Sequence, residues 1–266
     1  MTGENTARSS GKSNPIGATA ENTDVALRVS PRGVLITLVV LIVLVYLSGT
    51  LVHVARLAGG YPIRDHLVRL FDLDWENNLP TWLSSTNLLI CAVLLALIAK
   101  AKRARRDAYA PYWFGLCLVF FYLAVDEAAS LHEVTIGPVG ELVGASGAFF
   151  AAWVIPAMIV LSIFSLLYLR FLFALPRRTQ ALFVLSGGLY VIGGLGFEML
   201  SWHYRFPLYD PENTEASRDL TYLMITHVEE LLEMLGVAVF TYSLLSYLGM
   251  NKITASMSVS PAGRDA

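Results

Sequence analysis

The chain has 266 residues, of which 55% are hydrophobic and only 15% charged, and its formal net charge is −2. A mean hydropathy of +0.57 is far above that of a soluble globular domain. No cluster of basic residues interleaved with aromatic ones is present, which excludes a nucleic-acid-binding surface. The composition therefore predicts an integral membrane protein. Its two cysteines, Cys91 and Cys117, fall inside apolar runs and are expected to pack rather than to form a disulfide.

The ends of the chain differ from its middle. Residues 1–30 are rich in Ser, Thr, Asn, Gly and Ala and show no apolar period, so we expect a disordered tail there and another over 250–266. The region 31–249 is expected to form one all-α transmembrane domain. Six apolar runs in it approach or exceed the roughly 20 residues that a bilayer requires. They fall at about 34–57, 81–99, 111–133, 148–173, 181–204 and 220–248. The first run is longer than the apolar part of a signal peptide, which indicates an uncleaved helix.

Residues 61–78, between the first two runs, alternate apolar and charged side chains. The apolar ones recur at helical spacing: Ile63, Leu67, Leu70 and Phe71. This spacing predicts a short amphipathic helix on the membrane surface, with Trp75 and Trp82 as interfacial anchors. An ordinary structured loop explains the pattern equally well.

Lysine and arginine are distributed unevenly along the chain. With six membrane crossings, 14 of them fall on the side of the two termini and 5 on the other side. The positive-inside rule then predicts that both termini lie in the cytoplasm. Under this orientation, five of the six runs carry unusual polar residues toward their outer ends.

The acidic stretch Asp126 to Glu133, at the end of the third run, contains three carboxylates and a histidine without a neighbouring Lys or Arg. At 100° per residue, Asp126, Ser130 and Glu133 share one helical face. In the sixth run, His227, Glu230 and Glu233 form a second stripe.

These stripes predict one shared site near the outer face. The expected metal ligands are Asp126, Glu198, His227 and Glu230. The expected catalytic groups are Glu133 and Glu233. The expected second layer or rim consists of Glu127, Ser130, His132, His53, Asn87 and His203.

Charged side chains at bilayer depth are unfavourable by at least about 2.5 kcal/mol each, so the acids need compensation. A divalent metal is one solution, and mixed oxygen and nitrogen ligands suit Zn, Fe or Mn. Alternatively, the acids are protonated and form a proton or ion path. As a third alternative, they line a water-filled vestibule with Arg56 or Arg205 as counter-ions.

Two stretches, Glu76-Asn-Asn-Leu-Pro-Thr-Trp-Leu-Ser-Ser85 and Asp126-Glu-x-x-x-x-His132-Glu133, together resemble a group of uncharacterised bacterial polytopic membrane proteins. The resemblance extends over the six runs and not over the tails. It implies a multi-pass protein of the bacterial inner membrane and implies no particular reaction.

Our leading hypothesis from the sequence is a metal-dependent membrane enzyme, hydrolase-like or oxidase-like, that acts on a lipid or another amphiphile. A proton- or cation-coupled transporter and a non-catalytic membrane assembly partner are the alternatives. Membrane lipid is the expected partner, and nucleic acid is not expected. The chain is expected to form a homo-oligomer or to be part of a larger membrane complex.

Overall fold

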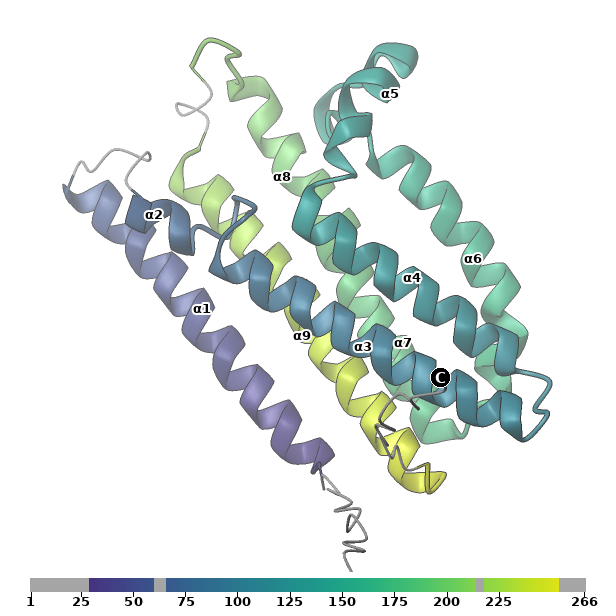
Figure 1. Ribbon diagram of the computed structural model, residues 1–266. Helices are drawn as coiled ribbons and strands as arrows, with labels where there is room; N and C mark the ends of the chain where they lie inside the picture. Colours follow the sequence, from purple (N-terminus) through teal and green to yellow (C-terminus); the bar gives the residue numbers. More distant parts are fainter. Residues whose placement is uncertain (1–28, 60–65, 214–217, 254–266) are drawn as a thin grey trace, which may run out of the picture. The chain divides into compact units, whose positions relative to one another are not determined.

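A computed structural model describes residues 29–59, 66–213 and 218–253, and within these ranges the chain is all-helical. Six helical stretches are long and apolar enough to cross a membrane. They are α1 (Pro31–Gly59), α3 (Leu79–Ala104), α4 (Ala110–Ala129), α6 (Val154–Ala174), the continuous stretch α7–η3–α8 (Arg177–Val191, Ile192–Phe197, Glu198–Arg205) and α9 (Leu220–Met250) (Figure 1). The predicted all-α class with six membrane helices is confirmed. The two predicted tails lie almost entirely outside the described residues.

Short elements connect the long helices. They are α2 (His66–Phe71), η1 (Glu133–Thr135), α5 (Ile136–Val143), η2 (Gly147–Phe149) and η4 (Phe206–Leu208). The six-residue α2 lies within the stretch where the apolar spacing predicted a surface helix, and it packs against α1 and α3. Residues 61–65 of that stretch, including Ile63, lie outside the described residues.

The turn between α2 and α3 is fixed by one asparagine. The side-chain oxygen of Asn78 accepts a hydrogen bond from the backbone N–H of Thr81 at 3.1 Å and thereby caps α3. Its amide nitrogen donates to the carbonyl oxygens of Asp72, at 2.6 Å, and of Trp75, at 2.7 Å. Pro80 stands in the first turn of α3, where its missing N–H is harmless. The segment 72–78, which carries Glu76, therefore has a defined conformation.

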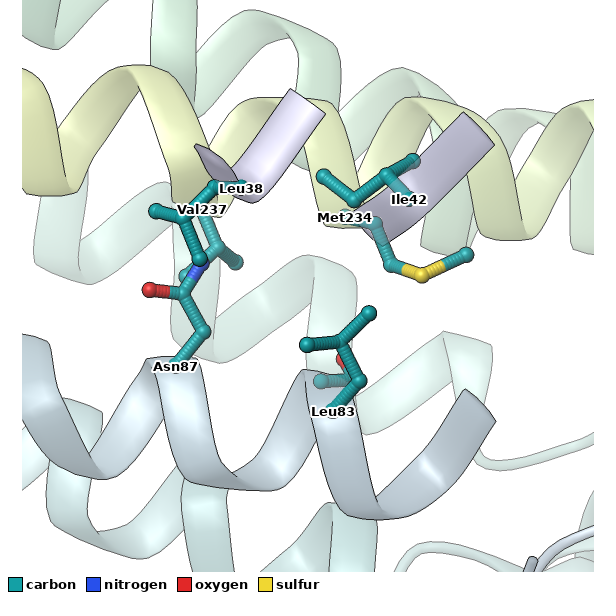
Figure 2. A pocket seen from close by; sticks show the side chains of 7 residues that line it. Leu38, Ile42, Leu83, Asn87, Met234 and Val237 are labelled. Atoms are coloured by element: carbon teal, nitrogen blue, oxygen red, sulfur yellow. The ribbon is translucent and has the colours of Figure 1, made fainter. Parts of the chain in front are cut away.

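Helices α9 and α3 are the most buried of the six, and α9 packs against α1, α3 and α7. A small cavity of about 10 Å³, enough for about one water molecule, lies where α1, α3 and α9 meet (Figure 2). It is lined by Leu38, Ile42, Leu83, Ser84, Asn87, Met234 and Val237. The two cysteines are free, as predicted; Cys91 is buried and its sulfur lies 3.1 Å from the hydroxyl of Thr241.

Several helix boundaries differ from the prediction; α3, for example, continues to Ala104 rather than ending near 99. Helix α4 ends at Ala129 rather than continuing to 133, because Ser130 adopts a left-handed conformation with φ of 51°. A carboxylate oxygen of Asp126 accepts the backbone N–H of His132 at 2.8 Å, which stabilises the turn. Ser130 and Glu133 consequently do not extend the helical face of Asp126, and that part of the prediction was wrong. Helix α6 begins at Val154 rather than near 148, since η2 and a turn precede it.

Candidate functional site

His132 is held from one side by the last turn of α4. Its Nδ1 lies 3.2 Å from Oδ2 of Asp126, while Oδ1 of the same carboxylate accepts the His132 backbone N–H. These two contacts fix both the position of the backbone and the orientation of the ring. The other ring nitrogen, Nε2, is directed to a different set of groups.

Two further carboxylates lie near the His132 ring. Nε2 of His132 lies 3.9 Å from Oε1 of Glu76. One ligand atom each of Glu76, His132 and Glu133 lies within 4.8 Å of the other two. We call Glu76, His132 and Glu133, with Asp126 behind the imidazole, the rim group. Glu133 is exposed, whereas Glu76 and His132 are half-buried, so the group is open to solvent on one side.

Burial and neighbouring charges both shift the pKa values of Glu76 and His132 in the rim group. Burial raises the pKa of Glu76 to about 7, and the nearby carboxylates of Glu133, Glu127 and Asp126 act in the same direction, while His132 opposes them. Burial disfavours the charged form of His132, yet the hydrogen bond to Asp126 and the surrounding carboxylates raise the pKa of this imidazole above its ordinary value. The rim group therefore favours the binding of a proton or another cation.

A second set of acids lies on the helices. We call Glu127, Glu198, Glu229, Glu230 and Glu233 the internal acids. The indole N–H of Trp153, whose ring centroid is 4.8 Å from that of His132, donates to Oε1 of Glu198 at 3.1 Å. Glu198 in turn faces Glu229, and Glu233 is within electrostatic range of both Glu127 and Glu198. Trp153 thus lies between the rim group and the internal acids.

His227 and Glu230, which the sequence placed in one stripe, have different neighbours. Nδ1 of His227 lies 3.2 Å from the hydroxyl of Thr50, and its ring centroid is 5.2 Å from that of His53. Glu230 instead interacts with Glu127 and Glu233. The structure therefore associates His227 with α1 and not with the internal acids.

His53 belongs to a buried ionic network. Its Nε2 lies 3.0 Å from Oδ1 of Asp72, and Arg218 bridges Asp72, at 3.2 Å, to Asp74. The hydroxyl of Tyr222 donates to Asp74 at 2.8 Å. This network joins α1, the α2–α3 segment and the beginning of α9.

The remaining predicted rim residues are dispersed. Asn87 accepts a hydrogen bond from the hydroxyl of Thr241 at 2.9 Å and lines the small cavity of Figure 2. Ser130 forms the left-handed end of α4, and His203 is exposed on α8. Glu127 lies beside Ser84.

Sequence reasoning missed several residues of these groups, above all Glu76. Glu76 stands in the Glu76-to-Ser85 stretch that carried the resemblance, but helical periodicity could not reveal how the segment before α3 folds toward the end of α4. Trp153, Asp72, Asp74, Arg218 and Tyr222 were missed for the same reason, since each acts through a contact with a distant part of the chain.

Fold and site together define a multi-span membrane protein with a carboxylate–histidine cluster at the ends of its helices. The chain belongs to the family described as a domain of unknown function, DUF8692, whose match covers residues 33–248. That match spans the six long helices, as the sequence resemblance did. No curated protein and no solved structure matches the chain.

Proposed function

We propose that this protein is a metal-dependent membrane enzyme whose rim group binds a divalent ion. The observation that carries the proposal is the convergence of ligand atoms from Glu76, His132 and Glu133 to within 4.8 Å of one another. Two carboxylates and one imidazole suit Zn, Fe or Mn. Three protein ligands leave coordination positions for water and substrate, as catalytic metal sites require.

The contact between Asp126 and His132 supports the same reading. A histidine that binds a metal through one ring nitrogen commonly donates its other N–H to a carboxylate, which sets the tautomer and the ring orientation. Asp126 occupies that position, 3.2 Å from Nδ1 of His132, and leaves Nε2 directed toward Glu76. In this proposal Asp126 orients a ligand, whereas the sequence hypothesis treated it as a ligand itself.

The position of the rim group supports an amphiphilic substrate. Glu133 is exposed directly beyond the end of α4, at the level where a membrane helix ends. A lipid headgroup could reach such a site without leaving the bilayer. A divalent ion there would lower the pKa of a bound water and polarise an ester or phosphate oxygen, which favours hydrolysis.

Metal affinity of the purified protein in detergent tests the proposal. We expect Glu76→Gln and His132→Gln to abolish tight binding of Zn²⁺ or Mn²⁺ in equilibrium dialysis, and Asp126→Asn to weaken it by about 10- to 100-fold. Glu141→Gln and His66→Gln, which change exposed residues of α5 and α2, are the matched controls. Equal binding by the wild type and His132→Gln would contradict the proposal.

Proton- or cation-coupled transport is the second candidate function. The observation that favours it is the continuation of acidic side chains from the rim group to Glu230 and Glu233 within α9. Reconstituted protein should then carry a pH-dependent flux in liposomes that Glu233→Gln reduces. Absence of flux under both a proton gradient and a cation gradient would exclude this candidate.

A further inference from the structure

Two carboxyl groups face each other inside the helical bundle. Glu198 begins α8 and Glu229 lies in the first third of α9. Oε1 of Glu198 accepts the indole N–H of Trp153. Glu229 is only 8% exposed, and its Oε2 is buried without a hydrogen-bond partner. A buried carboxyl oxygen without a hydrogen-bond donor is unfavourable unless the group binds a proton or another ligand.

The groups around this pair add negative charge. His132 is a basic side chain within electrostatic range of Glu198. The acidic groups that face the pair come from the α2–α3 segment and from α9: Asp74, Glu230 and Glu233. Carboxylates so close to one another, away from water, cannot all be ionised without a compensating cation or proton.

Geometry favours protons over a metal ion. A structural or catalytic metal needs three or more protein ligand atoms around one point. In the part of the chain that the structure describes, the rim group is the one set of three such residues whose ligand atoms converge within 4.8 Å. Among the described residues the internal acids do not converge in this way, so the geometry supports a proton rather than a shared metal ion between them.

We propose that Glu198 and Glu229 share a proton at neutral pH and form the centre of a proton-binding site among the internal acids. A protonated carboxyl group becomes a donor, whereas an ionised one can only accept. A shared proton would therefore allow the two carboxyl groups to lie face to face. This site goes beyond the proposed function and does not depend on metal at the rim group; it would supply or accept a proton for chemistry or transport there.

Infrared difference spectroscopy in H₂O and D₂O tests the proposal, because protonated carboxyl groups have a distinct C=O stretch. The background protein and all variants carry Glu76→Gln, since Glu76 has a pKa of about 7 and would contribute a signal of its own. At pH 7 we expect a protonated-carboxyl band in this background. Glu229→Gln should remove or shift it, and Glu198→Gln should do the same. Glu141→Gln, in the exposed α5, should leave it unchanged.

A background protein without any protonated-carboxyl band at pH 7 would overturn the proposal, and this result requires no variant of the pair to fold. A band that persists unchanged in both Glu198→Gln and Glu229→Gln would also overturn it. Metal analysis of the wild-type protein separates the two proposals. A band without stoichiometric metal refutes the metal enzyme alone, and metal without a band refutes the proton site alone.

Discussion

Among single residues, Glu76 has the clearest electrostatic consequence. Its pKa rises from an ordinary value of 4.5 to about 7, chiefly through burial. Because the folded chain then binds this proton more tightly than the unfolded chain does, the contribution to stability is complete below about pH 4.5 and is lost as the pH rises through about 7.

We therefore predict that metal-free protein, kept in chelator and detergent, becomes less stable as the pH is raised across this interval. Glu76→Gln should reduce the decrease, because glutamine does not titrate. Thermal unfolding at several pH values measures the effect, with Glu141→Gln as the control for an exposed glutamate. An equally steep decrease in Glu76→Gln would show that other groups cause it.

It was easier to predict from the sequence which residues belong to a site than which of them contact one another. The sequence singled out Asp126, His132 and Glu133 as neighbours of one site, and the structure brings them together. It also grouped His227 with Glu230 by their spacing of three, yet the two side chains have different neighbours. Helical spacing determines the direction of a side chain from its own axis, but it cannot determine which other helix lies there.

At the scale of elements, Arg218 connects the α2–α3 segment to the region before α9. It bridges Asp72, which is fully buried, and Asp74. Arg218→Met would leave two carboxylates without this partner, and breaking a buried ion pair from one side destabilises by about 3–5 kcal/mol. We expect a clear decrease of the unfolding temperature in detergent.

Arg178→Met is the matched control for this prediction. Arg178 donates to the hydroxyl of Tyr242 at an exposed position, where such an interaction contributes about 1 kcal/mol or less. Similar stability of the two variants would contradict a structural role of the buried network.

The π-helical segment η3 allows close approach of two spans. A Cβ on Gly193 would lie 2.8 Å from the carbonyl oxygen of Glu229 and 2.9 Å from Cγ of Glu233. Gly193→Ala should therefore separate η3 from α9 and destabilise the protein by about 1–3 kcal/mol. Gly188→Ala, four residues before η3 begins, meets nothing within 4 Å and should be neutral or stabilising. Equal unfolding temperatures of the two variants would refute the close approach.

The existence of the six long helices could be predicted from hydropathy, whereas the residues at which they end depend on contacts with other parts of the chain. Six runs of apolar residues predicted the six long helices because a bilayer demands that length. The end of α4 at Ala129 depends on the carboxylate of Asp126 accepting the backbone N–H of His132, which replaces continued helix with a turn. An aspartate that caps a turn and one that continues a helix look identical in a sequence.

For the whole molecule, the distribution of Lys and Arg predicts that both termini face the cytoplasm. Arg105, after α3, should then be cytoplasmic, and Glu141, in α5, should lie on the outer side. With Cys91 and Cys117 replaced by alanine, we expect an impermeant thiol reagent added to intact cells to label Glu141→Cys and not Arg105→Cys. The reverse pattern would invert the topology and place the rim group at the cytoplasmic face.

The most direct measurement for the whole account is the metal content of the purified protein. Elemental analysis of wild-type protein, loaded with Zn²⁺, Mn²⁺ or Fe²⁺ and freed of excess ion, should find a single divalent ion per chain. The double variant Glu76→Gln/His132→Gln should contain none, although it remains folded. Wild-type protein without stoichiometric metal, or a double variant that retains it, would contradict the assignment of the rim group as a metal site.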